Sequence, residues 1–213
     1  MSKVKKEKVG FLERFLASLG KRLMFFRAQK VSKLTINLAH REFVRLLVDI
    51  HGDLPSALNA IFKMAANAGP DFLMKWIEGG SAIFSKNVGD HALWIKSGYY
   101  AFTGDHISNI EYFPPRKAGE PHRVVWKLDK CFICSGMEND PTFQVKKEDL
   151  EAFGWGTVIA GIFTATTNMI NEYAGIEFTS TVRETKCLLK GDPYGEFVAE
   201  FYPKEKDEPE ILE

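Results

Sequence analysis

The chain has 213 residues, 45% of them hydrophobic, and its 28 Lys and Arg residues balance 28 Asp and Glu residues. A chain of this length and composition can bury one sizeable core. It has no apolar run near the roughly 20 residues that span a bilayer, and its start lacks the features of a secretory signal. Three cysteines, an odd number, argue against a disulfide framework and favour a reduced, cytoplasmic setting.

Charge is distributed unevenly along this neutral chain. Residues 1–34 carry ten Lys or Arg against Glu7 and Glu13, a net charge of +8, so the remainder carries −8. We therefore divide the chain into a basic N-terminal helix (1–34), one folded domain (35–203) and an acidic, flexible tail (204–213). A basic arm on an acidic body predicts attraction to an anionic surface, or to the acidic face of another copy.

The basic arm is also patterned. Five apolar residues recur at spacings of four and three, which places them on one face of a helix over residues 9–27: Leu12, Leu16, Leu19, Leu23 and Phe26. This stripe is expected to be buried in the domain, in a partner or at a membrane surface, and the first two are the more ordinary outcome for such a helix.

Residues 36–79 read as helices. "REFVRLLVDI", "LPSALNAIFKMAANAG" and "DFLMKWIEGG" have helical periodicity, with Asp53 or Ser56 available as a cap before the second. Their inner faces are rich in aromatic residues and methionine. Such residues more often belong to the hydrophobic core than to the wall of a hydrophobic ligand pocket. The candidates for a pocket wall are Phe62, Phe72, Met74 and Trp76.

Strand signals follow from residue 91. Alternation and aromatic content predict strands in "HALWIKSGYYAF", "HISNIEYF" and "HRVVWKLDKCFICSG". A helix is predicted from "EDLEAF" to "NEYAG", with small residues that allow close approach of another backbone. Two further strands, "IEFTSTVRETKCLLK" and "GEFVAEFYP", surround a Gly-Asp turn. The order of helices, strands, helix and strands predicts an α+β fold in which a helical layer packs on an antiparallel sheet.

The stretch from "GWGTVIAGIF" to "GEFVAEFYP" resembles the C-terminal half of the 4-vinyl reductase domain, and equally the small core subunits of the TRAPP vesicle-tethering complex. The resemblance is specific over about 130–203, looser over 36–129 and absent from the basic arm. It implies a ligand-binding or scaffold fold that is commonly a homodimer through its helices. In several members this fold has an apolar cavity for hydrocarbons, phenols or acyl chains.

The resemblance also implies a metal site, with departures. Glu184 and Cys187 match a Glu-x-x-Cys pattern that holds zinc in phenol-sensing members of the group. Those members add a cysteine after the Gly-Asp turn, where this chain has Gly195, and one from the preceding helix, which here has none. Acyl-carrying TRAPP subunits use a cysteine in the helical half. Since no cysteine precedes Cys131, covalent acylation there is excluded.

The cysteines are still of the residue type that zinc prefers as a ligand. Cys131 and Cys134 form a CxxC pair at a strand end, and with Cys187 and Glu184 they would give three thiolates and one oxygen. Buried core thiols and a redox dithiol are the alternatives. The redox alternative ranks last, because the chain lacks a thioredoxin-like setting.

No phosphate-binding loop, dinucleotide fingerprint or nucleophile motif is present, and basic residues do not alternate with aromatics as on a nucleic-acid-binding sheet. We therefore expect a non-enzymatic sensor or carrier of a small hydrophobic ligand. Ile162 would line its cavity and Trp155 would lie near the mouth. The alternative is a TRAPP-like dimeric scaffold, recruited to membranes or partners by residues 1–34. An enzyme acting on an unsaturated group ranks third.

Overall fold

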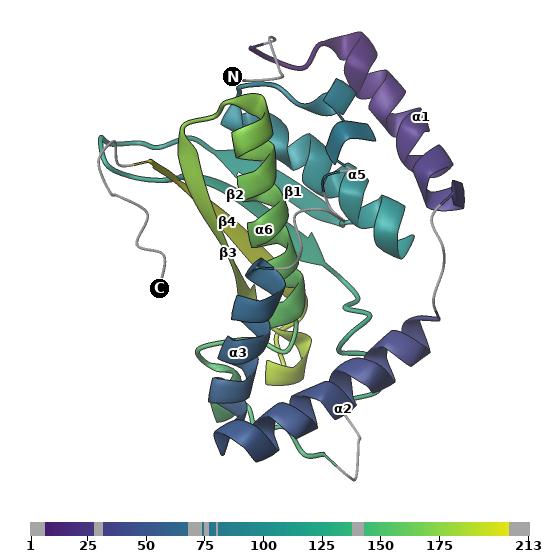
Figure 1. Ribbon diagram of the computed structural model, residues 1–213, viewed down its shortest axis with the longest axis vertical. Helices are drawn as coiled ribbons and strands as arrows, with labels where there is room; N and C mark the ends of the chain where they lie inside the picture. The colour runs from purple at the N-terminus through teal and green to yellow at the C-terminus, as the bar shows by residue number, and fades with distance from the viewer. Residues whose placement is uncertain are drawn as a thin grey trace.

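The structure is a computed structural model that describes residues 7–27, 32–67, 74, 77–79, 81–137 and 143–204. Its sheet is antiparallel with the strand order β1-β2-β4-β3. The strands are β1 (Asn109–Phe113), β2 (His122–Leu128), β3 (Phe178–Lys186) and β4 (Gly195–Pro203). Helix α6 (Thr157–Ala174) packs along this sheet (Figure 1). The α+β fold predicted from the sequence is confirmed.

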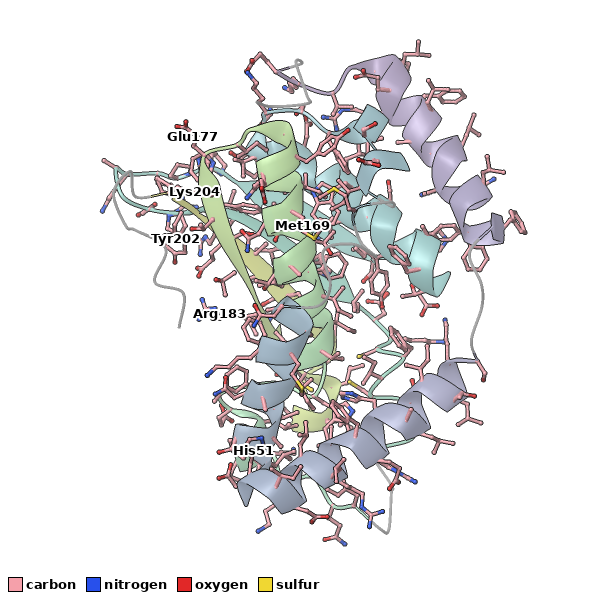
Figure 2. All side chains as sticks on the ribbon, viewed as in Figure 1. His51, Met169, Glu177, Arg183, Tyr202 and Lys204 are labelled. Atoms are coloured by element: carbon pink, nitrogen blue, oxygen red, sulfur yellow. The ribbon has the colours of Figure 1, made fainter. Side chains whose placement is uncertain are left out.

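The sheet has one buried and one polar face, as the period of two in its strands requires. On the buried face, Trp126 of β2 stacks on Phe197 of β4 with ring centroids 5.6 Å apart, and both side chains are fully buried. On the other face, Arg183 pairs with Glu200 at 2.9 Å, and Tyr202 donates a hydrogen bond to the same carboxylate (Figure 2). The core therefore lies between the sheet and the helices.

Two further helices extend the helical layer. Helix α2 (Lys33–His51) packs on α3 (Leu54–Ala66), and α3 packs on α6. The last contact depends on Gly161, because a Cβ atom there would lie 2.6 Å from the Ala65 Cβ and 2.7 Å from the Phe62 carbonyl oxygen. At the start of α3, the Asp53 carboxylate accepts the Ser56 N–H at 2.7 Å. This is the cap that the sequence offered.

Residues 91–102, predicted to be a strand, instead belong to helix α5 (His91–Thr103), which ends at Gly104 with φ 74°. The aromatic alternation was misleading because α5 is covered on two sides. Trp94 and Tyr99 contact Phe163 of α6, and helix α1 (Phe11–Arg27) lies against the helix from outside. A helix covered in this way carries few polar residues, so its 3.6-residue period is weak.

Helix α1 covers Phe11–Arg27, close to the predicted 9–27, and burial of its apolar stripe in a partner or at a membrane stays a prediction. The five residues of its apolar stripe are 52–74% exposed: Leu12, Leu16, Leu19, Leu23 and Phe26. Within the described parts of the chain, the domain therefore does not cover this stripe. None of the described helices has both the length and the apolar character needed to cross a bilayer.

Candidate metal centre

The ends of β2 and β3 meet at the start of β4. Leu128, the last residue of β2, pairs with Gly195, and Lys186, the last residue of β3, pairs with Glu196. The segments that follow these strands are therefore brought together, and they carry the three cysteines. All three side chains are 1% exposed or less: Cys131, Cys134 and Cys187.

Tight turns hold the cysteines in place. After β2, the Cys131 carbonyl accepts the N–H groups of Cys134 and Ser135, both at 3.1 Å. After β3, the Cys187 N–H donates to the Asp192 carboxylate at 2.8 Å, and Gly191 takes a φ of 91°. This left-handed conformation favours glycine. The Gly-Asp turn noted in the sequence therefore positions the Cys187 backbone.

Three of the four predicted ligands form one compact group. The Cys134 sulfur, a Glu184 carboxylate oxygen and the Cys187 sulfur all lie within 4.8 Å of one another. Cys131 lies outside this group but is hydrogen-bonded to Cys134 through its side chain. The structure thus places all four residues in one cluster at the sheet edge, with the cysteines buried and Glu184 half-buried.

Glu184 occupies a cradle made by two glycines that precede α6. A Cβ atom on Gly154 would lie 1.9 Å from Glu184 Oε2, and one on Gly156 would lie 3.0 Å from Oε1. The Gly156 N–H donates to Oε2 at 2.7 Å. The other oxygen, Oε1, is buried and has no hydrogen-bond partner. A buried acceptor of this kind is costly unless something binds it.

Burial and mutual repulsion perturb the ionisation of the whole cluster. Burial, followed by the charges of Cys187 and Cys131, raises the pKa of Glu184 well above its usual value. The hydrogen bond from the Cys134 thiol lowers the pKa of Cys187 to about 6 and also lowers that of Cys131. The pKa of Cys134 is raised by the same hydrogen bonds. Anions crowded in an apolar site would be stabilised by a cation.

Helix α2 packs against the turn after β2 that carries Cys131 and Cys134, called here the cysteine turn. The Asn37 side-chain amide donates to the carbonyls of Phe132 and Ser135. The His40 ring meets the Trp155 ring edge-on at 5.3 Å, and burial lowers the pKa of His40 to about 4. Trp155 in turn donates its indole N–H to the Ile133 carbonyl at 3.1 Å. This support could not be predicted from the sequence, because a lone Asn and a lone His on a helix are common.

The residues of the cluster fit zinc. Tetrahedral Zn²⁺ takes thiolate ligands at about 2.3 Å and carboxylate oxygens at about 2.0–2.2 Å, so its ligand atoms lie roughly 3.5–4 Å apart. A group that spans at most 4.8 Å needs only small shifts to reach this geometry. The unpartnered Glu184 Oε1 offers a ligand atom, and the low pKa of Cys187 supplies a thiolate at neutral pH. Cys131 can supply the fourth ligand.

The residues predicted to line a hydrophobic pocket do not converge in the described parts of the chain. Phe62 is partly buried against Phe153, with ring centroids 6.2 Å apart, and Met74 is partly buried against the core. Trp155 is fully buried beside the metal cluster, and Ile162 is 43% exposed. Phe72 and Trp76 lie outside the described residues.

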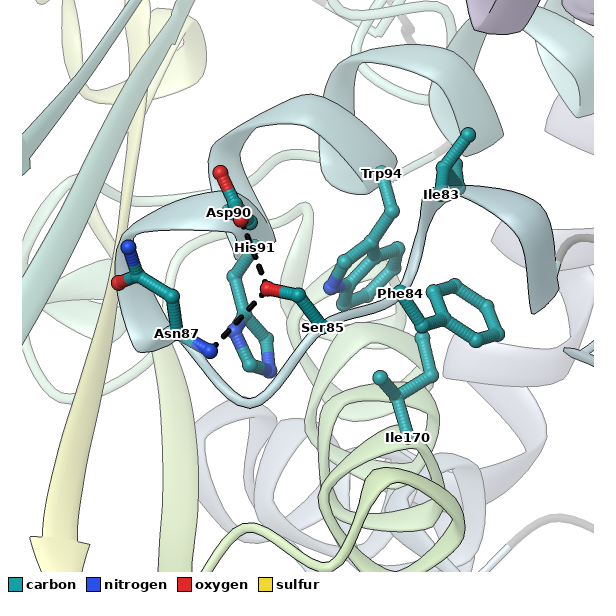
Figure 3. A pocket seen from close by; sticks show the side chains of 8 residues that line it. All are labelled: Ile83, Phe84, Ser85, Asn87, Asp90, His91, Trp94 and Ile170. Atoms are coloured by element: carbon teal, nitrogen blue, oxygen red, sulfur yellow. Dashed lines mark hydrogen bonds between the residues drawn. The ribbon is translucent and has the colours of Figure 1, made fainter. Parts of the chain in front are cut away.

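The structure does contain one small hollow, shown in Figure 3, that the sequence did not predict. Phe84, Trp94 and Ile170 are among the residues that form its apolar walls, and it has no room for a water molecule. Several of its polar groups have partners, but the buried Trp94 indole N–H has none. Ser85 donates to Asp90 at 2.7 Å, and both ring nitrogens of His91 are hydrogen-bonded. The hollow is therefore too small to serve as the predicted ligand cavity.

Comparisons with known proteins support the fold rather than a family. No protein-family model matches the sequence, and no curated protein matches it. The structure is similar to a trafficking protein particle complex subunit 3 from Naegleria fowleri covalently bound to palmitic acid. The identity is 17% and the TM-score is 0.55, over 82% of this chain and all of that one.

A second similar structure is the phenol-responsive sensory domain of the transcription activator PoxR with phenol. The identity is 15% and the TM-score is 0.48, over 81% of this chain and 76% of that chain. The protein therefore has the α+β fold of a TRAPP subunit.

Proposed function

We propose that this protein is a non-enzymatic binding domain that holds one zinc ion and takes up a small hydrophobic ligand, as a sensor or carrier. The observation that carries the zinc part is the buried group of Cys134, Glu184 and Cys187, with its unpartnered carboxylate oxygen. Cys131 completes the coordination. Zinc bound there would fasten the turn after β2 to the end of β3 and to the glycines before α6.

The zinc site we propose is structural rather than catalytic. Catalytic zinc sites keep one position open for water or substrate, whereas structural sites are closed by four protein ligands. Three cysteines and a glutamate would fill all four positions, and all three cysteine side chains are buried. Zinc binding would then contribute directly to the free energy of folding.

For the ligand, support comes from the fold and from the composition of the helical layer. The similar TRAPP subunit is covalently bound to palmitic acid. This chain has no cysteine in its helical half, and its three cysteines belong to the metal cluster. A guest would therefore be held by apolar contacts alone. The site we propose lies in the helical half, beside Phe62 and Met74.

Elemental analysis of the untagged full chain tests the zinc proposal. We expect about one zinc per chain and, after treatment with a chelator, a lower melting temperature. Cys134→Ser should lose the metal, and Ser135→Ala, which changes the neighbouring hydroxyl, is the matched control. A protein that is free of metal and melts identically with and without chelator would leave core thiols as the better interpretation.

Native mass spectrometry and thermal-shift screening test the ligand proposal. Fatty acids, phenols and polycyclic aromatics are the probes, and a bound guest should raise the melting temperature with the logarithm of its concentration. The absence of any response in a zinc-loaded protein would refute the ligand part and leave the zinc part standing.

One observation favours the second candidate, a TRAPP-like dimeric scaffold. Helix α2 carries apolar residues on its exposed side at spacings of three and four: Ile36, Ala39, Phe43, Leu46 and Ile50. This is the narrow seam that two helices use when they pair. The adjacent side of α2 is buried through Val44 and Leu47. The partner we propose for this seam is the α2 helix of a second copy.

A further inference from the structure

Helix α1 is attached to the domain by its less apolar side. The buried Asp90 carboxylate, 4% exposed, accepts the Val9 N–H at 2.8 Å and pairs with the Arg14 guanidinium. Further along, the buried Ala17 faces the domain, and the Phe25 ring lies 5.4 Å from the Tyr100 ring. An ion pair and a few contacts with α5 thus fix the rotation of α1 about its own axis.

This rotation leaves the apolar side of α1 exposed. Seven large apolar residues are 52–89% exposed: Phe11, Leu12, Phe15, Leu16, Leu19, Leu23 and Phe26. At 100° per residue they occupy an arc of about 140°, roughly opposite Ala17 and Arg14. We call this arc the outer face of α1. It is continuous over the length of the helix, since its members recur in each turn.

The outer face is larger than an ordinary exposed patch. Given the exposed fractions of its three phenylalanines and four leucines, its area is on the order of 800 Å². The largest apolar patch on a typical soluble monomer covers about 300–600 Å² and is often functional. A face of this size indicates that something covers it in the working protein.

The charges around the outer face are basic. Arg22 is exposed and falls within the arc, whereas Glu13, the single acidic residue of α1, lies outside it and accepts the Gly10 N–H at 2.7 Å. Residues 1–34 as a whole carry a net charge of +8. A partner of this face should therefore be apolar within and anionic at its surface.

The width of the outer face distinguishes between two kinds of partner, another helix and a membrane surface. A helix that pairs with another helix presents a narrow seam of spacing three and four, as α2 does. The outer face of α1 is instead a broad arc with phenylalanine and leucine along its whole length. A broad apolar arc that includes one basic residue, Arg22, and no acidic one matches a flat interface between apolar and anionic layers.

We propose that α1 lies in the headgroup layer of an anionic membrane, with its outer face toward the acyl chains and Arg22 among the lipid phosphates. The Asp90 contacts hold the domain against the opposite side of the helix, so the protein would be a peripheral membrane protein with α1 as its docking element. This inference does not depend on zinc or on a ligand in the helical half.

Co-sedimentation of the full-length protein with vesicles tests the proposal. We expect binding to phosphatidylcholine vesicles with about 30% phosphatidylserine, much weaker binding to pure phosphatidylcholine, and weakening in about 0.5 M salt. Phe15→Asp with Leu19→Asp should reduce binding at least roughly 100-fold, because two exposed apolar anchors become charged. Leu34→Asp with Leu38→Asp, a similarly exposed pair on α2 outside its proposed seam, is the matched control and should bind like the wild type.

Each other outcome counts against the proposal. Failure of the wild type to bind anionic vesicles overturns it. Loss of a dimer, rather than of lipid binding, in the α1 pair would assign the outer face to a second copy. If the α1 pair unfolds by circular dichroism, Arg22→Glu replaces it. This single exposed change should lower binding roughly 10-fold, and an unchanged affinity would refute the lipid contact.

Discussion

Glu184→Gln should change the stability of the metal-free and zinc-bound protein in opposite directions. Glutamine has nearly the same shape, and its carbonyl oxygen can accept the Gly156 N–H that now donates to Oε2 at 2.7 Å. Its amide would replace Oε1, the buried oxygen without a partner. The substitution therefore keeps the packing in the glycine cradle and removes only the carboxylate charge and one ligand atom.

Without metal, the variant should be the more stable protein. Burial and the Cys187 charge raise the pKa of Glu184, so at neutral pH the side chain must either take up a proton or carry an unfavourable charge. Glutamine is neutral at every pH and avoids this cost. With zinc, the variant should lose at least about 100-fold in affinity, since even partners of zinc ligands contribute 10–100-fold.

The pH dependence has a defined sign. The folded pKa of Glu184 lies above the unfolded value, so its contribution to stability is fully present below the unfolded value of 4.5 and is lost as pH rises through the folded pKa. In chelator, the advantage of Glu184→Gln should therefore grow as pH rises from about 4.5. In zinc the order reverses, because metal binding requires the ionised carboxylate.

Urea unfolding at several pH values, in chelator and in excess zinc, measures both effects in the same protein. Gly20→Ala, where a Cβ would meet nothing within 4 Å, provides a control variant away from the cluster. A variant that binds zinc as tightly as the wild type would show that Glu184 is not a ligand. A variant that is less stable than the wild type in chelator at neutral pH would refute the inference that ionisation of the buried Glu184 carboxyl is unfavourable.

Three further predictions concern the stability effects of His40 and Gly161 and the proposed pairing of α2. Burial lowers the pKa of His40 to about 4, so its stabilising contribution is present above its unfolded pKa and lost as pH falls through 4. At pH 5 this loss is about 2 kcal/mol, and His40→Phe should remove it in urea titrations. Gly161→Ala should destabilise the protein by about 1–3 kcal/mol by forcing α3 from α6, whereas Gly20→Ala should not. If α2 pairs with a second copy, Phe43→Asp should halve the mass measured by light scattering.

The fold was largely predictable, because its strands and most of its helices carry strong local signals. The Gly-Asp turn and the alternation of "GEFVAEFYP" predicted strands that the structure contains as β3 and β4. Helix α5 was not predictable in this way. Its two covered sides remove the polar positions from which a helical period is recognised, and Tyr99 and Tyr100 favour a strand by propensity alone.

The grouping of Glu184 with the cysteines was predictable by residue type, and its geometry was not. Glu184 and the cysteines could be grouped because strand ends were expected to meet, and register places those ends at Gly195 and Glu196. The cradle of Gly154 and Gly156 was invisible in the sequence, since a glycine before a helix is ordinary. The side of α1 that contacts the domain was also unpredictable, because periodicity identifies the apolar face without stating what covers it.

Helix α2 connects the two proposed activities of the domain. Its inner side contacts the cysteine turn, through Asn37 at the Phe132 and Ser135 carbonyls and through His40 at the Trp155 ring. Its outer side carries the seam proposed to meet a second copy. Because a rigid helix cannot move one side without the other, loosening of the cysteine turn on metal loss would also shift the seam. Zinc content and dimer affinity should therefore change together.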